Sequence, residues 1–251
     1  MTATPVLAGR RALITGAASG IGAAIARAYA EAGAALALAD LDAAGLEAVA
    51  DGLPGGTAVT RHALDVTDDG AVRETVAAAI SAHGGLDVLV NGAGILSEVP
   101  LVEMDTATWD RMLEVDLRSV FLCCRHTVPH MIEAGGGRVV NIASQLGQKG
   151  GEGLTHYSAA KAGVIGFTKA LALEVSRHGV LVNAIAPGPI ETPLIGGLSA
   201  EWKAAKGAEL PLGRFGRPEE VAPTAVLLAS DPGGNLYTGQ TLGPNSGDVM
   251  L

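Results

Sequence analysis

The sequence contains few aromatic residues and almost no cysteine. Trp, Tyr and Phe number two, three and three among 251 residues, against 35 glycines, which predicts close packing through small side chains. The two cysteines, Cys123 and Cys124, are neighbours in an apolar helical pattern, so their side chains point in different directions. A disulfide between them would be strained, and a metal site would need more ligands. We therefore expect both thiols to pack in the core and no metal to be bound.

Basic clusters and long apolar runs are also missing. Lys and Arg total 17 against 26 Asp and Glu, which gives a formal net charge of −9 and argues against a nucleic-acid partner. No apolar run approaches the roughly 20 residues that cross a bilayer, so we expect no membrane association. The first residues lack the charged and apolar regions of a signal peptide. We expect a cytoplasmic, soluble protein.

Short apolar runs alternate with longer amphipathic ones, a pattern typical of repeated β-α units. The centres of the short runs are apolar on both faces, as in a parallel sheet covered by helices on each side. The sequence predicts an α/β, doubly wound Rossmann fold with seven strands, in one domain over residues 1–251. The expected strands are Ala12–Thr15, Ala35–Ala39, Ala58–Ala63, Val88–Asn91, Arg138–Ile142, Leu181–Ala186 and Gln240–Leu242.

Two expected helices are longer than the rest. One runs from about Thr106 toward Glu133, with a late kink at Pro129, and the other from about His156 to Arg177. Both are apolar around much of their circumference, which predicts burial in a homotetramer or homodimer. Residues 188–210 form the one long irregular segment, rich in Gly and Pro. Long loops of this kind are typically functional, so we expect a substrate-binding loop there.

A glycine-rich turn, Thr15–Gly22, joins the first expected strand to a helix. Such a turn brings backbone N–H groups close to a pyrophosphate at the positive end of the helix. Asp40 ends the second strand, where a carboxylate binds ribose hydroxyls and repels a 2′-phosphate. No Lys or Arg lies in Gly16–Gly22 or directly after Asp40. The pattern favours NAD over NADP. Asp65 either contacts the adenine edge or is a solvated carboxylate after its strand.

Tyr157 and Lys161 lie four residues apart at the start of a helix and so share one face. A phenol with a pKa near 10 is a poor base at neutral pH, but a nearby cation lowers that pKa. Tyr157 could then exchange a proton with an alcohol or ketone oxygen. Ser144, just after the fifth strand, has a hydroxyl suited to orienting a carbonyl.

With these residues in view, the chain resembles the short-chain dehydrogenase/reductase family over nearly its whole length. The matching motifs are Thr15–Gly22, Asp65-Val66, Asn91–Gly94, Ser144 thirteen residues before Tyr157, and Pro187–Thr192. The resemblance implies that Ser144 holds the substrate oxygen, Tyr157 is the general acid or base, and Lys161 tunes Tyr157 and binds ribose hydroxyls. It implies cofactor contacts from Gly16, Ser19, Gly20, Ile21, Gly22, Asp40, Asp65, Val66, Asn91, Ala93, Gly94, Tyr157, Lys161, Pro187, Gly188, Ile190 and Thr192.

The chain departs from the family at Asp116, where many members carry an Asn that anchors a water in the proton relay. No Asn occurs between Thr106 and Glu133, so a shifted alignment does not restore it. A buried carboxylate near Lys161 would stabilise the ammonium and raise its pKa. We expect Asp116 to be an ionised counter-ion in the catalytic group; a protonated acid that mimics the amide, and a solvated helix-face carboxylate, are the alternatives.

The resemblance also indicates where the substrate binds. The expected contacts are Leu96, Ser144, Gln145, Leu154, His156, Tyr157, Leu194 and Trp202. They suit a secondary alcohol or ketone of modest size, cyclic or polyhydroxylated molecules included, although a role for His156 as a helix-entry residue alone is equally open. A 3-oxoacyl thioester reductase is the nearest alternative, and it usually prefers NADPH. A catalytically weak NAD-binding sensor is the alternative from another class; the presence of Ser144, Tyr157 and Lys161 argues against it.

Overall fold

The computed structural model describes residues 4–196 and 200–250, and it contains one seven-stranded sheet. Its strand order is β3-β2-β1-β4-β5-β6-β7, and every neighbouring pair is parallel. The strands are β1 (Arg11–Thr15), β2 (Ala35–Asp40), β3 (Val59–Ala63), β4 (Val88–Asn91), β5 (Gly137–Ile142), β6 (Val180–Ile185) and β7 (Thr241–Leu242). In chain order, strands are added outward from β1 to β3 on one side of the sheet and, from β4 on, outward on the other side. The loops after β1 and β4 therefore leave the sheet in opposite directions, and a crevice opens between them.

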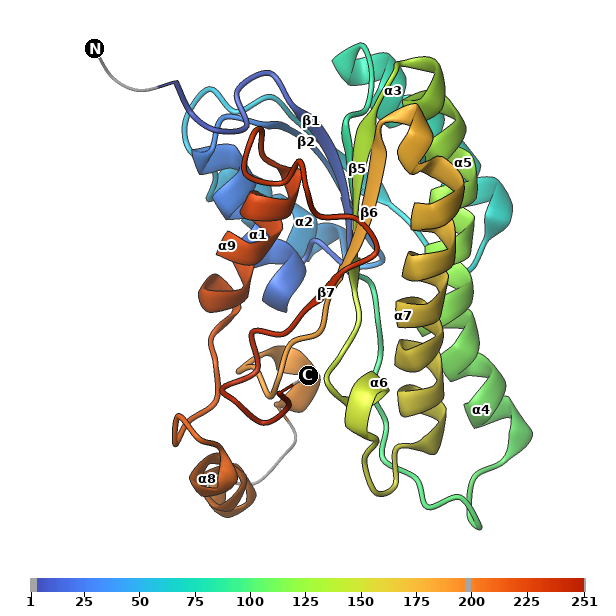
Figure 1. The fold of residues 1–251 in the computed structure, drawn as a ribbon, viewed down its shortest axis with the longest axis vertical. Coiled ribbons are helices and arrows are strands. Elements are labelled where there is room, and N and C mark those ends of the chain that lie inside the picture. The colour runs from blue at the N-terminus through green and yellow to red at the C-terminus, as the bar shows by residue number, and fades with distance from the viewer. Residues whose placement is uncertain (1–3, 197–199, 251) are drawn as a thin grey trace.

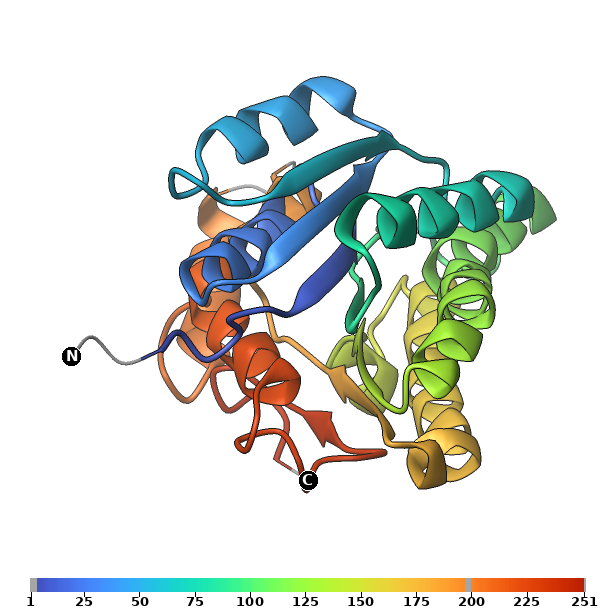
Figure 2. The same cartoon turned by 90° about the horizontal axis from the view of Figure 1, so that it is seen from above.

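Helices cover both faces of the sheet (Figures 1 and 2). On one face lie α1 (Gly20–Glu31), α2 (Ala43–Asp51) and α9 (Pro218–Ala229), which share an apolar core with the sheet. On the other lie α3 (Asp69–His83), α5 (Ser119–Glu133) and α7 (Thr155–Val175), which enclose a second core. This arrangement confirms the expected doubly wound fold. Helices lie on both faces because each apolar face of the sheet needs an apolar layer against it.

The remaining elements lie mainly in the loops that follow the strands. They are α4 (Thr106–Leu113), the π-helical turn η1 (Glu114–Arg118), α6 (Leu146–Lys149), the 3₁₀ turns η2 (Ser176–His178) and η3 (Pro193–Ile195), and α8 (Ala200–Glu209). The expected irregular segment 188–210 holds η3 and α8. None of the helices in the described residues is long and apolar enough to cross a membrane.

The two long helices follow the prediction with one difference. The expected helix from Thr106 to Glu133 is present as α4, η1 and α5 in direct succession. We expected its irregularity at Pro129, but α5 runs through Pro129 as a helix and the irregular turn lies earlier, at η1. A π turn inserts one extra residue into the helix and frequently marks a functional site.

Tyr29 shows how two of the three helices of the first core, α1 and α9, are joined. Its side chain in α1 is fully buried, and its hydroxyl donates a 3.0 Å hydrogen bond to the Ala225 carbonyl oxygen in α9. Tyr29→Phe keeps the ring packing but removes this donor, so we expect the free energy of unfolding to fall by about 1 kcal/mol. Urea unfolding measures the change. An unchanged unfolding midpoint would show that the bond adds nothing to stability.

Candidate active site

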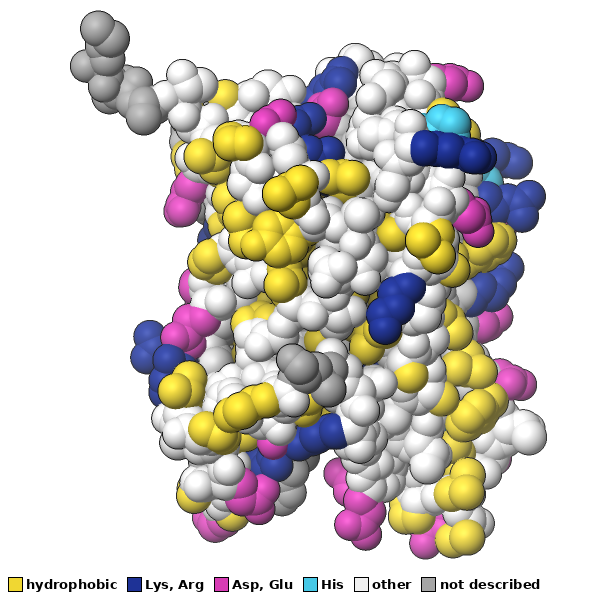
Figure 3. All heavy atoms as spheres, viewed as in Figure 1, with side chains coloured by type: hydrophobic (Ala, Val, Ile, Leu, Met, Phe, Trp, Pro, Cys, Tyr) yellow, Lys and Arg dark blue, Asp and Glu magenta, His cyan; other side chains and the backbone are white. Residues whose placement is uncertain are grey.

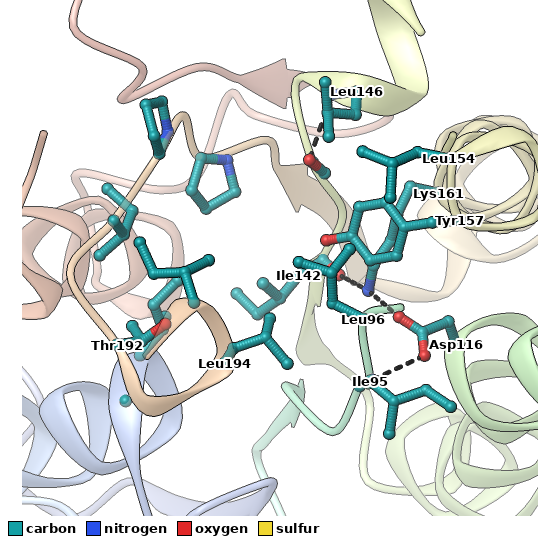
Figure 4. A pocket seen from close by; sticks show the side chains of 18 of the residues that line it. Ile95, Leu96, Asp116, Ile142, Leu146, Leu154, Tyr157, Lys161, Thr192 and Leu194 are labelled. Atoms are coloured by element: carbon teal, nitrogen blue, oxygen red, sulfur yellow. Dashed lines mark hydrogen bonds and ion pairs between the residues drawn. The ribbon is translucent and has the colours of Figure 1, made fainter. Parts of the chain in front are cut away.

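A cavity of about 1060 Å³ opens at the carboxyl ends of the strands. That volume lies at the upper end of the range for small-molecule sites and has room for a dinucleotide with a small substrate. Most of the expected site residues line it: Gly16, Ser19, Gly20, Ile21, Gly22, Asp40, Asp65, Val66, Ala93, Gly94, Leu96, Asp116, Ser144, Gln145, Leu154, Tyr157, Lys161, Pro187, Gly188, Ile190, Thr192 and Leu194. Figure 4 shows ten of the lining residues by name, grouped around the open space.

The glycine-rich turn fits closely against the backbone of its neighbours. Gly16 has a φ of +68°, and a Cβ there would lie 2.6 Å from the carbonyl of Gly92. A Cβ on Gly22 would lie 2.0 Å from the Gly16 carbonyl oxygen. Side chains are therefore excluded at both positions, and the first turn of α1 meets the cavity with its backbone N–H groups. This arrangement fits a pyrophosphate.

Asp40 lies at the end of the cavity next to that turn. One carboxylate oxygen accepts a 3.0 Å hydrogen bond from the Ala18 N–H, and the other accepts one from the Asp42 N–H. Among the described residues, the cations that line the cavity are Arg111, Lys149, Lys161 and Lys206, none of which comes from the glycine-rich turn or the segment after β2. The charge at this end of the cavity is negative.

Asp65 and Asn91 have contacts of their own. Asp65 lines the cavity, and its carboxylate also accepts hydrogen bonds from the N–H and hydroxyl of Thr67, which hold its pKa below the usual value. Asn91 was expected to touch the cofactor, but it is buried and outside the cavity wall. Its amide donates to Asn141 Oδ1 and Cys124 Sγ. A polar side chain inside a strand needs a buried partner, so the Asn91 amide faces these two residues and not the cavity.

The ammonium of Lys161 is almost completely buried in the site. The residue is 4% exposed, and Nζ donates a 3.0 Å hydrogen bond to the Ile142 carbonyl oxygen at the end of β5. Nζ lies 5.6 Å from the ring centre of Tyr157, one helical turn earlier in α7. Ser144 follows β5 and lines the same part of the cavity. The structure thus brings Ser144, Tyr157 and Lys161 together at the carboxyl end of β5.

Asp116 is the counter-ion of this ammonium. Its side chain is fully buried; Oδ2 lies 3.1 Å from Lys161 Nζ, and Oδ1 accepts a 2.8 Å hydrogen bond from the Ile95 N–H (Figure 4). The residue sits in the π turn η1, which directs it toward α7. A Cβ on Gly94 would lie 2.9 Å from Oδ2, so only glycine allows this approach.

Burial and charge act in opposite directions on Lys161 and Tyr157. Burial lowers the pKa of Lys161, but attraction to Asp116 and Tyr157 outweighs it, so the net pKa is raised. Burial raises the pKa of Tyr157, and Asp116 raises it further; the Lys161 charge and a hydrogen bond with Ser144 lower it by less. The lysine alone was expected to lower the tyrosine pKa. The desolvation of the phenol prevails, so the net pKa of Tyr157 is raised.

The expected substrate wall is largely present, with one correction. Leu96, Gln145, Leu154 and Leu194 line the cavity, whereas the His156 side chain is fully buried behind the wall. Its Nε2 lies 2.9 Å from the hydroxyl of Ser97, which does line the cavity and which we had not predicted. The expected contact Trp202 lies outside the residues whose side chains the structure describes.

The C-terminal segment also contributes an acidic residue that the sequence did not reveal. The same carboxylate oxygen of Asp248 accepts 2.6 Å hydrogen bonds from Gln145 Nε2 and Lys149 Nζ, and Lys206 Nζ in α8 lies 3.9 Å from it. These contacts hold the pKa of Asp248 below its usual value although burial raises it. Asp248 thus connects the segment after β5, helix α6 and helix α8, each of which lines the cavity. It lies 99 residues from Lys149, so no local pattern could have indicated the pairing.

A glycine-rich turn at the switch point of a parallel sheet, lining one cavity with a Tyr-Lys pair, is typical of a dinucleotide-dependent oxidoreductase. Comparison with known proteins agrees. Residues 16–247 match the family described as enoyl-(acyl carrier protein) reductase. The chain is 42% identical to a 3-oxoacyl-[acyl-carrier-protein] reductase of Thermotoga maritima, over 97% of this chain and 99% of that protein. It is 45% identical to a cis-4-hydroxycyclohexanecarboxylate dehydrogenase of Sinomonas cyclohexanicum, over 88% and 90%.

A solved structure of a short-chain type dehydrogenase/reductase from Mycobacterium marinum superposes with a TM-score of 0.94 and 35% sequence identity, covering 99% of this chain and 98% of that one. The chain belongs to the short-chain dehydrogenase/reductase family. It is an oxidoreductase of the kind that interconverts hydroxyl and keto groups with a nicotinamide cofactor.

Proposed function

We propose that the protein transfers a hydride between NAD(H) and a secondary alcohol or ketone of modest size, cyclic or polyhydroxylated substrates included. The observation that carries the proposal is the convergence of Ser144, Tyr157 and Lys161 on one end of a cavity whose other end carries Asp40. In this reading Ser144 and Tyr157 hold the substrate oxygen. Thr192 and the backbone near Ile190 hold the nicotinamide carboxamide.

The bound nicotinamide ring supplies or takes up the hydride. Tyr157 exchanges the proton of the substrate oxygen: its hydroxyl donates to the ketone oxygen during reduction, and its phenolate accepts the alcohol proton during oxidation. Ser144 donates a hydrogen bond to the same oxygen and fixes its position. The ammonium of Lys161 stabilises the phenolate, and it also donates hydrogen bonds to the nicotinamide ribose.

Asp116 acts as an ionised carboxylate in this proposal. Both of its neighbours are donors, since the Ile95 N–H faces Oδ1 and the Lys161 ammonium faces Oδ2. A protonated acid would need an acceptor for its own hydrogen, and neither contact provides one. The buried pair would then keep Lys161 charged across the working pH range.

Asp40 and the absence of a nearby cation support NAD as the cofactor. A 2′-phosphate at the adenosine ribose would lie against a carboxylate and would find no Lys or Arg from the described part of the adjacent turn. Of the four described cations on the cavity wall, Lys161 pairs with Asp116, and Lys149 and Lys206 lie beside Asp248. This distribution fits ribose hydroxyls at Asp40 better than a phosphate.

A 3-oxoacyl thioester reductase is the second candidate, and the 42% identity to the Thermotoga maritima protein favours it. The surface around the cavity speaks for a smaller substrate. On the face in Figure 3, acidic side chains lie over the lower end, toward the loops that follow the strands. Glu98, Glu152 and Glu209 are part of the cavity wall. Seven acidic residues against four basic ones line the described cavity wall, and this net negative charge disfavours a phosphorylated carrier. The similarity to a dehydrogenase of a hydroxylated cyclohexane ring supports a compact alcohol.

The assembly and compartment remain predictions that we include in the proposal. Phe121 on α5 is 42% exposed and Leu173 on α7 is 87% exposed, so both long helices carry apolar side chains that a second copy could cover. A homotetramer, or a homodimer, would bury them. The free buried thiols of Cys123 and Cys124 are compatible with the reducing cytoplasm.

Tyr157→Phe tests the reaction. Removing the phenol hydroxyl takes away the proton donor and acceptor, so we expect the turnover of ketones and alcohols to fall by about 100- to 10,000-fold. NADH binding, measured by fluorescence titration, should stay within about twofold because the ring is retained. The nicotinamide absorbance follows turnover. Activity retained in the variant would reject Tyr157 as the acid or base, and a wild type that turns over no carbonyl would support the NAD-binding sensor instead.

Asp40→Ala tests the cofactor. Loss of the carboxylate removes the repulsion of a 2′-phosphate together with the ribose contact, so the ratio of kcat/KM for NADPH to that for NADH should rise about tenfold, a change of ~1.4 kcal/mol. The exposed Asp51 at the end of α2 provides a matched control, Asp51→Ala, which should leave the ratio unchanged. A wild type that prefers NADPH would contradict the NAD assignment.

Asp116→Asn tests the buried charge. Because the Asp116 charge raises the pKa of both Tyr157 and Lys161, its removal should lower both values. The rate of alcohol oxidation rises with pH as the phenolate forms, so its ascending limb should move to lower pH. Glu114→Gln, on the same π turn but half-exposed, is the control and should not move the limb. An unmoved limb with full activity in Asp116→Asn would make Asp116 a bystander.

A further inference from the structure

Ser97 places one hydroxyl on the substrate side of the cavity wall. It follows Leu96 in the segment between β4 and α4, and the neighbouring wall is formed by apolar side chains such as Leu96, Leu146 and Leu154 (Figure 4). The backbone here is fixed, because the Val99 N–H donates a 2.9 Å hydrogen bond to the Gly153 carbonyl oxygen. Ser97 is therefore a hydroxyl at a defined place in the wall, beside apolar side chains and the adjacent Glu98.

The hydroxyl of Ser97 is held by a histidine that has no access to the cavity. His156 is 0% exposed, its Nε2 lies 2.9 Å from Ser97 Oγ, and its Nδ1 is buried without a hydrogen-bond partner among the described residues. His156 lies in the first turn of α7, next to Tyr157. A buried imidazole that contacts a hydroxyl of the cavity wall is suited to orienting that hydroxyl.

The surroundings of His156 determine whether its ring is charged and which ring nitrogen carries the hydrogen. Burial lowers its pKa, with Asp116 acting weakly in the opposite direction, and the positive end of α7 also disfavours a charged ring. In the neutral ring one nitrogen carries the hydrogen. A buried N–H without an acceptor is rarer than an unused acceptor, and the helix N-terminus favours a lone pair at Nδ1. The hydrogen therefore lies on Nε2, which donates to Ser97 Oγ.

We infer that Ser97 is a specificity-determining residue that donates its hydroxyl hydrogen to a second oxygen of the substrate, and that His156 is its positioning residue. With Oγ already accepting from Nε2–H, the Ser97 hydrogen is directed away from the histidine and toward the cavity. The group it meets must be an acceptor: a hydroxyl, a carbonyl or a carboxylate carried by the substrate apart from the reacting oxygen. The inference rests on the proposed function and narrows its substrate class.

Substitution of Ser97 with matched substrates tests the inference. The substrates are cyclohexanone, which has no second oxygen, and cyclohexanones that carry a hydroxyl or a carboxylate at the 2-, 3- or 4-position. Ser97→Ala should lower kcat/KM for at least one of the oxygenated ketones by about 3- to 10-fold, the range of one hydrogen bond, and leave cyclohexanone within about twofold. A role in stability alone would lower both by the same factor.

Three further variants complete the design. Ser158→Ala removes a hydroxyl from α7 outside the cavity wall and should leave the substrate preference unchanged. His156→Gln keeps a side-chain N–H near Ser97 and should retain part of the preference, whereas His156→Leu should lose it. If Ser97→Ala fails to fold, Ser97→Cys keeps the volume with a weaker donor and should show the same loss.

The outcomes separate the inference from the proposed function. Equal losses on plain and oxygenated ketones in the Ser97 variant, with a wild type that reduces both, would overturn the role of Ser97 and leave the proposed function intact. A wild type that reduces no ketone with NADH or NADPH would overturn the proposed function, and the inference with it. A selective loss in Ser97→Ala together with an unchanged Ser158→Ala would support both.

Discussion

The burial of the Lys161 ammonium is the constraint on which the geometry of the site depends. A charge that is 4% exposed is stable only where partners replace its water. The partners come from separate elements: the Ile142 carbonyl oxygen at the end of β5, and Asp116 on the π turn between α4 and α5. Asp116 in turn accepts from Ile95, just after β4. One cation thus joins two strand ends and two helical segments, and Tyr157 lies beside it.

Close approach of these elements requires glycine at the points of contact. A Cβ on Gly94 would meet Asp116, one on Gly147 would lie 2.6 Å from the Lys161 carbonyl carbon, and one on Gly163 would lie 2.8 Å from the Leu117 side chain. The π turn and α6 therefore both pack directly on α7. Glycine at these positions lets the backbone of neighbouring elements pack closely around one face of α7.

The sequence was sufficient for the fold because the five central strands, β2, β1, β4, β5 and β6, are short, mostly apolar and largely buried. β4 has the predicted ends, and β2 and β5 are each longer by one residue. That Tyr157 and Lys161 share one face could also be predicted, since the helix period fixes it, and the resemblance to the family added Ser144. The direction of the Asn91 side chain could not be predicted, because a polar residue at a strand end can contact a ligand or a buried amide equally well.

Depth of burial and long-range pairing explain the other differences. The sequence shows the charge of Lys161 beside Tyr157, but the desolvation that raises the tyrosine pKa depends on what covers the phenol. His156 resembled a wall residue because it precedes Tyr157, yet its partner Ser97 lies 59 residues away. Asp248 reaches Gln145 over a still longer separation. Such contacts depend on how loops from different strands meet, which no local periodicity encodes.

Two buried polar contacts at the start of α7 set the orientation of Tyr157. His156 contacts Ser97 on the segment after β4, and Lys161 contacts Asp116 and the end of β5. A rotation of α7 about its axis would leave a buried imidazole and a buried ammonium without partners at the same time, and each would be costly. Because Tyr157 lies between them on the first two turns, the same contacts that satisfy the buried groups fix the direction of the phenol. The contacts of His156 and Lys161 therefore hold the hydroxyl of Tyr157 in place.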